Sequence, residues 1–466
     1  MRKIEFENTE ALAEKWVTEW RELCRIPSVS GALEAIHEAA NWIERRLAPL
    51  MDETRRIDIP GHGPVVAGRL QGDSDQAILL YTHYDTQPAG SEDRWSSPPF
   101  AADVHDGKVF ARGACDDKAD VASRLQALSL WLATHKGRPP FTIVFLADPA
   151  EEVGSPGLRE VLEANRDFLR ADACLWESYL REVDGRPAVG FGCRGTLEVL
   201  LRVETLGSDQ HTSLAPILRS PALELIRAIA SLTDETGLLA LPEIWQMVDR
   251  PTQKQLDYAA EIVLPTGAVE RAGTNPYLPV SDSELKRRWS FAPALSVGRI
   301  VINEDEIGVI PAAAEATIRI SQVPSMTPEE CMHVLRRHFD IHGFGAVVLK
   351  PGRMILPAAS PTDSPFATAV LNAARETWGE PVVYPLMTGA GPGRVFLDVL
   401  GAPLVSPTGT LRPDGNMHAV DEHGAINDYL DHVRFNICLL EQLTEVWADT
   451  CVQSDKSTLT ATEVPR

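Results

Sequence analysis

Short apolar runs that end in acidic or imidazole side chains constrain this chain more than any other feature. Residues 77–81 form an unbroken apolar run of the length expected for a strand buried on both faces of a parallel sheet. His83 and Asp85 follow, and side chains two positions apart on an extended backbone point the same way. Such a pair suits a metal site, because the carboxylate can bind the ion or orient the imidazole. A His-x-Asp sequence is common by chance, so its context decides.

Two later apolar runs end in the same way. Residues 141–147 form a second predicted buried strand, and Glu151 and Glu152 follow it closely. Residues 173–176 form a third, which ends in Glu177. Ligands of open α/β sheets bind beyond the carboxyl ends of the strands. We therefore expect these carboxylates to converge with His83 in one crevice.

The candidate residues share one chemistry. They are carboxylates and imidazoles at strand ends or in adjoining loops: His83, Asp85, Asp116, Asp117, Glu151, Glu152, Glu177 and His418. So many carboxylates in one pocket would repel one another strongly unless cations neutralise them. Without Cys-rich spacing, the set suits zinc or manganese in a two-metal site, which needs a bridging carboxylate. The adjacent Glu151 and Glu152 offer one residue for such a task and one for a general base.

Simpler interpretations exist for each residue taken singly. Asp85 or Asp116 could cap a following helix, the two adjacent glutamates could lie in a solvated first turn, and His418 could be a surface histidine. The glycine-rich stretch 389–393 lacks the GK[ST] sequence of a phosphate loop, and Pro392 interrupts it, which favours a tight loop. The joint spacing of the candidates favours the metal site.

Length and composition limit the other possibilities. A chain of 466 residues is too long for one core, so two or three domains are expected. The net charge of -22 argues against nucleic acid or an anionic membrane as a partner. Seven scattered cysteines without a CxxC pair fit reduced thiols. With no signal-like start and no apolar run long enough to cross a bilayer, we expect a cytoplasmic protein.

The pattern of predicted helices and strands changes twice along the chain. Residues 1–193 alternate predicted helices and strands. Residues 119–135 place four apolar side chains on one helical face, namely Val121, Leu125, Leu128 and Leu132. Residues 194–351 mix strands and helices without acids at the strand ends, which indicates an inserted domain. The pattern of residues 1–193 returns over residues 352–466. The predicted fold class is α/β, with a catalytic domain in two parts (1–193 and 352–466) and an inserted α+β domain (194–351).

The motifs resemble the M20 family of co-catalytic metallopeptidases. They appear in the family's order at residues 83–88, 113–118, 151–155, 177 and 418–422. Residues 309–312 and 318–329 are most similar to the branch of carnosinase and the cytosolic non-specific dipeptidase. The resemblance implies a zinc-peptidase-like catalytic domain, with a mixed, mainly parallel sheet between helices, and a lid and dimerisation domain as the insert.

The resemblance also implies a role for each residue of the metal site. One cation would be held by His83, Asp116 and Glu177, and the other by Asp116, Glu152 and His418, so that Asp116 bridges them. Asp85 would orient His83. Glu151 would be the general base that takes a proton from the bridging water.

Further roles follow for the insert and for a loop after it. His211 matches a lid histidine that reaches the active site of a partner subunit and stabilises the oxyanion. Arg319 matches an arginine that receives the substrate carboxylate, a task suited to its fork of donors. The chain departs from the family at residues 388–394, where Gly391 and Arg394 stand in a substrate loop that usually carries a serine, and at Ala119 and Asp421. Arg394 could favour an acidic substrate.

The sequence thus predicts a metal-dependent hydrolase with two zinc or manganese ions. It would cleave the amide bond of a dipeptide or related small amide with a free carboxylate, and it would form a homodimer through the insert. The alternative is a deacylase or carboxypeptidase that acts on N-acyl or N-carbamoyl amino acids. A metal-binding scaffold without catalysis is a third interpretation, which the presence of Glu151 argues against.

Overall fold

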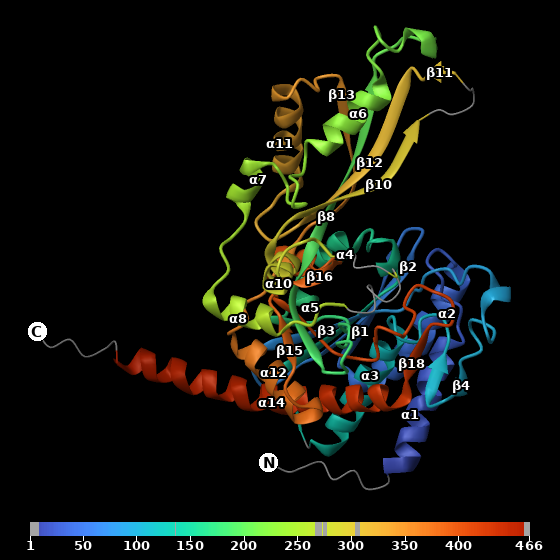
Figure 1. Ribbon diagram of the computed structural model, residues 1–466. Coiled ribbons are helices and arrows are strands. Elements are labelled where there is room, and N and C mark those ends of the chain that lie inside the picture. The colour runs from blue at the N-terminus through green and yellow to red at the C-terminus, as the bar shows by residue number, and fades with distance from the viewer. Residues whose placement is uncertain (1–8, 136, 266–272, 274–276, 303–307, 461–466) are drawn as a thin grey trace, which may run out of the picture. The chain divides into compact units, whose positions relative to one another are not determined.

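The computed structural model describes residues 9–135, 137–265, 273, 277–302 and 308–460, with the backbone alone at residue 9 and over 449–460. The chain divides into two compact units (Figure 1). The first comprises residues 1–192, 360–384 and 395–466, and the second comprises residues 193–359 and 385–394. The fold class is α/β, as predicted. The predicted domain boundaries stay a prediction.

The first unit is built on a mixed sheet whose central strands are parallel. Its strands, in spatial order, are β1 (Glu53–Ile59), β2 (Gly63–Leu70), β6 (Thr142–Asp148), β3 (Ala77–His83), β7 (Ala173–Leu175), β17 (Leu404–Pro407), the start of β8 (Ala188–Glu204) and β15 (Val382–Tyr384). The four strands from β6 to β17 run parallel to one another, whereas β2 and β8 on either side of them pair antiparallel. Every residue of β3 and β6 is buried, as expected for strands covered on both faces.

Helices surround this sheet in Figure 1. They are α1 (Thr9–Cys24), α2 (Leu33–Leu47), α3 (Lys118–Thr134), α4 (Leu158–Ala164), α5 (Arg166–Leu169), α12 (Pro365–Trp378), α13 (Arg394–Leu400, with its first residue in the second unit) and α14 (Ile426–Thr460). A small antiparallel sheet adds β4 (Asp103–His105), β5 (Lys108–Phe110) and β18 (His423–Ala425). Helix α3 packs against α1, α14 and β3. No helix among the described residues is long and apolar enough to cross a bilayer.

More residues of α3 are buried than its apolar pattern predicts. The sequence places one apolar face toward the core, but Asp120, Ser123 and Arg124 are buried as well. The physical reason is that α3 has neighbours on several sides, namely a strand of the sheet and two other helices. Polar side chains buried in this way need internal partners.

The second unit has a mainly antiparallel sheet and its own core. Its elements are the rest of β8, β9 (Gln210–His211), β10 (Ala294–Ile302), β11 (Val309–Ile310), β12 (Ala313–Gln322), β13 (Val347–Ile355), β14 (Ala358–Ala359), β16 (Met387–Ala390), α6 (Pro221–Ala230), α7 (Pro242–Met247), α8 (Gln253–Glu261), α10 (Asp282–Phe291) and α11 (Pro328–Ile341). Strand β12 pairs with β8 and β10, and alternate residues along it are buried. Helices α6 and α11 cover that buried face.

Candidate metal centre

His83 ends strand β3 with its ring fully enclosed. The side chain is 1% exposed, and Nδ1 lies 3.2 Å from the carbonyl oxygen of Asp85 and 3.3 Å from Oδ1 of the same residue. Asp85 thereby occupies one ring nitrogen and leaves Nε2 to face the other candidates. This geometry is what the predicted orienting role of Asp85 requires.

Asp116 lies between two imidazoles. Its Oδ1 is 3.1 Å from Nε2 of His83, and its Oδ2 is 2.8 Å from Nε2 of His418. Each carboxylate oxygen therefore faces a different histidine, as a carboxylate that bridges two cations would. The loop that carries His418 is far from Asp116 in the sequence and meets it through this contact.

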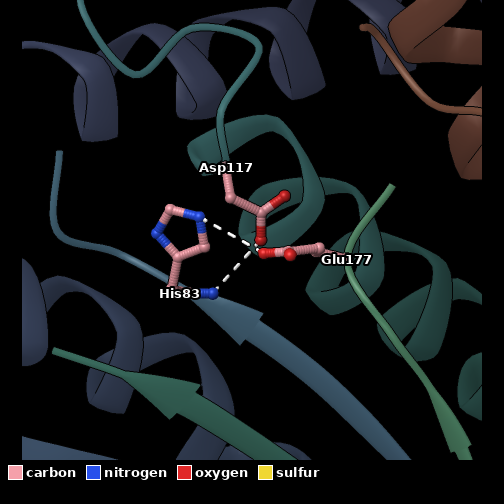
Figure 2. Close-up of side chains that lie close together, drawn as sticks. All are labelled: His83, Asp117 and Glu177. Atoms are coloured by element: carbon pink, nitrogen blue, oxygen red, sulfur yellow. Dashed lines mark hydrogen bonds and ion pairs between the residues drawn. The ribbon is translucent and has the colours of Figure 1, made fainter. Parts of the chain in front are cut away.

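The first donor cluster consists of His83, Asp117 and Glu177 (Figure 2). One donor atom from each residue lies within 4.8 Å of the others. Oε1 of Glu177 accepts a hydrogen bond of 2.7 Å from Nε1 of Trp176, and Oε2 lies 3.5 Å from Nε2 of His83. That Oε2 atom is buried and accepts no hydrogen bond. A buried carboxylate oxygen without a donor is costly, and a cation would satisfy it.

The second cluster consists of Asp116, Glu152 and His418, whose donor atoms also lie within 4.8 Å of one another. Oε2 of Glu152 is 3.2 Å from Nε2 of His418 and accepts a hydrogen bond of 2.8 Å from Nε2 of Gln87. The five predicted ligands therefore come together in the first unit. Their assignment as ligands stays a prediction.

Two carboxylates that sequence reasoning left without a role also support the site. Oδ2 of Asp117 accepts hydrogen bonds from the hydroxyl of Thr82, at 2.6 Å, and from the backbone N–H of His83, at 3.1 Å. Glu422 is buried, pairs with Arg112 at 2.6 Å, and accepts the backbone N–H of Asp116 at 3.3 Å. The sequence does signal Asp117, because it stands next to the acidic Asp116. It does not signal the role of Glu422, because that role depends on an ion pair with the distant Arg112.

The electrostatics show a site with surplus negative charge. Burial, followed by the charges of nearby carboxylates, raises the pKa of Glu151 well above its ordinary value and the pKa of Glu177 to about 8. Hydrogen bonds to Asp116 and Glu152 raise the pKa of His418 to about 10. Burial opposes ionisation of Asp116, but hydrogen bonds from the two histidines hold its pKa below its ordinary range. Divalent cations would relieve this crowding, so the donor set fits them.

His211 and Arg319 belong to the second unit. Nδ1 of His211 accepts a hydrogen bond of 3.2 Å from the backbone N–H of Ser213, and the side chain is exposed. Arg319 lies on β12 and pairs with Glu198 at 3.0 Å. Both side chains therefore have partners within the second unit. Their predicted contacts with substrate stay predictions.

Gly391 and Arg394 also belong to the second unit. The carbonyl oxygen of Gly391 lies 3.6 Å from Sγ of Cys193, and Nη1 of Arg394 donates a hydrogen bond of 3.3 Å to the carbonyl of Pro357. Gly391 directly follows strand β16, which pairs in parallel with β8, and Arg394 begins α13. Their predicted role in substrate binding stays a prediction.

The fold and the paired donor clusters define a class, the metal-dependent hydrolases whose centre is built for two cations. The chain belongs to peptidase family M20/M25/M40, whose model matches residues 79–442. The resemblance to M20 metallopeptidases is thus confirmed, and the chain is an enzyme, a dipeptidase-like metallopeptidase of this family.

Individual relatives agree with the family. The chain is 28% identical over 356 residues to the Cys-Gly metallodipeptidase of Schizosaccharomyces pombe, covering 70% of this chain and 72% of the relative. It is 28% identical over 290 residues to the Beta-Ala-His dipeptidase of Rattus norvegicus, covering 59% and 58%. The solved structure of an M20 family metallo-carboxypeptidase from Sulfolobus solfataricus matches with a TM-score of 0.81 and 25% identity, covering 92% of this chain and 99% of that one.

Proposed function

We propose that this chain hydrolyses the amide bond of a dipeptide, or of a related small amide with a free carboxylate. The observation that carries the proposal is the position of Asp116, which faces His83 with one oxygen and His418 with the other. A hydrolase of this type needs two adjacent cation sites with a shared carboxylate and a nearby base.

The second cluster matches one predicted ligand set, whereas the first contains Asp117 where the predicted set has Asp116. We keep His83, Asp116 and Glu177 for one ion, because Nε2 of His83 lies 3.1 Å from Oδ1 of Asp116 and 3.5 Å from Oε2 of Glu177. Asp116, Glu152 and His418 would hold the other. Zinc or manganese suits this set of nitrogen and oxygen donors. When bound, the two ions would polarise the substrate carbonyl and lower the pKa of the attacking water.

Glu151 would act as the general base. Its backbone N–H donates to Oδ1 of Asp85 at 3.0 Å, which fixes it beside the residue that orients His83. Burial and the charges of Glu177 and Asp116 raise the pKa of its carboxyl. A carboxylate with a raised pKa accepts a proton from the attacking water readily and can pass it to the leaving amine.

The substrate proposal draws on the two dipeptidase relatives and on the second unit. Arg319 would bind the substrate carboxylate with its fork of donors, His211 would stabilise the oxyanion, and Gly391 and Arg394 would line the substrate site. The similarity to the Sulfolobus solfataricus metallo-carboxypeptidase favours a carboxypeptidase as the second candidate. Both candidates use the same attack on an amide, so a substrate panel distinguishes them.

We also propose a homodimer formed through the second unit. Strand β10 is the last strand in the order of its sheet. Two apolar side chains on this strand, Val297 and Ile300, are 44% and 48% exposed. An exposed edge strand with apolar side chains is a ready surface for pairing with a second copy. A cytoplasmic location is proposed as well, which the described cysteines support because none forms a disulfide.

The variant Glu151→Gln tests the proposal. It should keep both metal ions and lose about a thousandfold or more in kcat on dipeptides, because general-base catalysis is removed while the ligands remain. The matched control is Glu160→Gln, which changes an exposed glutamate on α4 and should leave kcat unchanged. Turnover retained by Glu151→Gln would overturn the assignment of the base. A panel of dipeptides, N-acyl and N-carbamoyl amino acids, with zinc and manganese supplied separately, identifies the substrate class.

A further inference from the structure

A fully buried ion pair on α3 contacts the chain next to two of the predicted ligands. Asp120 and Arg124 lie one helical turn apart, with Nη2 of Arg124 2.8 Å from Oδ2 of Asp120, and both side chains are 0% exposed. Burying two charges costs desolvation energy, so a buried ion pair is weak evidence for stability alone. Its other partners therefore indicate what it does.

The guanidinium of Arg124 lies where two strands of the sheet separate. Strands β3 and β7 pair in parallel only as far as Leu80 and Leu175. Beyond that point Arg124 donates to the carbonyl of Tyr81 on β3, and to the carbonyls of Leu175 at 3.3 Å and Trp176 at 2.5 Å on the other side. The side chain thus joins the two strand ends after their last paired residues.

Asp120 holds the chain on the far side of Glu177. Its Oδ2 accepts the backbone N–H of Ser178 at 2.8 Å, and its Oδ1 accepts the hydroxyl of Ser178 at 2.6 Å. Nδ1 of His432, a buried residue of α14, lies 3.3 Å from Oδ1 of Asp120. Glu177 is therefore flanked by two held backbone groups. Arg124 binds the carbonyl of Trp176 before it, and Asp120 binds the N–H of Ser178 after it.

We propose that Asp120 and Arg124 are positioning residues, which fix the spacing of His83 and Glu177 and so set the affinity of the cation site that these two residues share. The proposal rests on the proposed function, because it takes this cluster as a metal site. A planar guanidinium can bond several carbonyls in fixed directions, whereas a lysine or an apolar side chain cannot. Ligands held at a fixed spacing bind a cation more tightly.

The second cluster supplies an internal reference. Glu152 is held by Gln87, and the loop before Asp116 is held by Glu422. Among the described residues, the α3 ion pair makes no hydrogen bond or ion pair with Glu152 or His418. Loss of the pair should therefore weaken one cation site and spare the other.

The experiment titrates metal-free protein with Co²⁺ and follows its visible absorption. The test variant combines Asp120→Asn with Arg124→Met, so that no unpaired charge stays buried. The control is Arg181→Met, which removes another buried arginine, one that lies 3.6 Å from Asp428. Glu177→Gln and Glu152→Gln give reference spectra for the loss of each site.

Wild type should bind two Co²⁺ ions per chain, and Arg181→Met should match it. In the double variant one of the two affinities should fall about 10- to 100-fold, the usual effect of losing groups that hold ligands. The spectrum of the ion that still binds should match that of Glu177→Gln. The Co²⁺ affinity of Arg124→Lys at the weakened site should lie between those of wild type and the double variant.

The outcomes separate the two proposals. Fewer than two ions bound by wild type would refute the proposed function. Two ions bound by the double variant with wild-type affinities would refute only the positioning role. An equal loss at both sites, or a loss that Arg181→Met shares, would also refute it. If circular dichroism shows the double variant unfolded, Arg124→Lys decides, and unchanged affinity there overturns the proposal.

Discussion

Oδ1 of Asp85 accepts a hydrogen bond of 3.0 Å from the backbone N–H of Glu151. The other oxygen of the same carboxylate accepts the backbone N–H of Glu152 at 3.3 Å and the hydroxyl of Ser30 at 2.6 Å. Asp85 also lies against Nδ1 of His83. One buried carboxylate therefore connects the end of β3 with the predicted base and one predicted ligand after β6.

The variant Asp85→Asn should consequently weaken both metal binding and turnover. The amide keeps one acceptor oxygen but loses the charge that faces His83, and its NH₂ group opposes a backbone N–H. Loss of such a partner usually costs about 10- to 100-fold in metal affinity or activity. Isothermal titration with Zn²⁺ and dipeptide kinetics measure the two effects. Asp58→Asn, an exposed aspartate on β1, is the control and should behave as wild type; equal behaviour of both variants would contradict the role of Asp85.

Metal binding should release protons at pH 7. Without metal, the pKa values of about 8 for Glu177 and about 10 for His418 leave both groups protonated at pH 7. A cation needs the deprotonated forms, so apparent affinity should rise with pH, about tenfold per pH unit for each proton displaced. Titration calorimetry in two buffers with different ionisation enthalpies counts these protons. An enthalpy that does not depend on the buffer would refute the prediction.

The sequence was sufficient to predict the parts of the site that follow buried strands. Residues 77–81 identify β3, so the positions of His83 and Asp85 follow from the strand period. The same reasoning applies to Glu177 after β7. Parallel strands share one carboxyl edge, so a rule of topology brings these side chains together without any knowledge of tertiary contacts.

Other parts could not be predicted because they depend on contacts between distant segments. The loop that carries His418 is tied to the loop before Asp116 by the ion pair of Arg112 and Glu422, which are 310 positions apart. Arg124 looks like a solvent-facing residue on an amphipathic helix, since only the apolar face of α3 gives a periodic signal. Its burial follows from the helices and strand that enclose α3, which no local pattern records.

Glu422→Gln should destabilise the protein as well as the site. The carboxylate is buried, pairs with Arg112 at 2.6 Å, and accepts the backbone N–H groups of Cys115 and Asp116. A hydrogen bond to a charged group contributes about 1.5 to 3 kcal/mol, and the remaining arginine would stay buried without its counter-ion. We expect the free energy of unfolding in urea to fall by about 2 to 3 kcal/mol. A double-mutant cycle with Arg112→Met isolates the pair, and additive effects of the two substitutions would show that they do not interact.

Asp148 should make stability depend on pH between about 4 and 6. Burial, together with the nearby charge of Asp85, raises the pKa of this carboxyl from 3.8 to about 6, although Ser155 and the N–H of Ala150 donate to it. The folded state therefore binds the proton more tightly than the unfolded state. Stability contributed by the protonated form is complete below about pH 4 and is lost as pH rises through 6.

The measurement compares wild type with Asp148→Asn, which cannot ionise. A shift of about two units corresponds to about 3 kcal/mol, so the stability of the variant relative to wild type should rise by up to that amount between pH 4 and pH 7. Urea unfolding of metal-free protein at several pH values gives the difference directly and cancels the titration of the other groups. Asp167→Asn, an exposed aspartate on α5, should show no such trend. A difference for Asp148→Asn that stays constant across this range would mean that Asp148 is ionised alike in the folded and unfolded states.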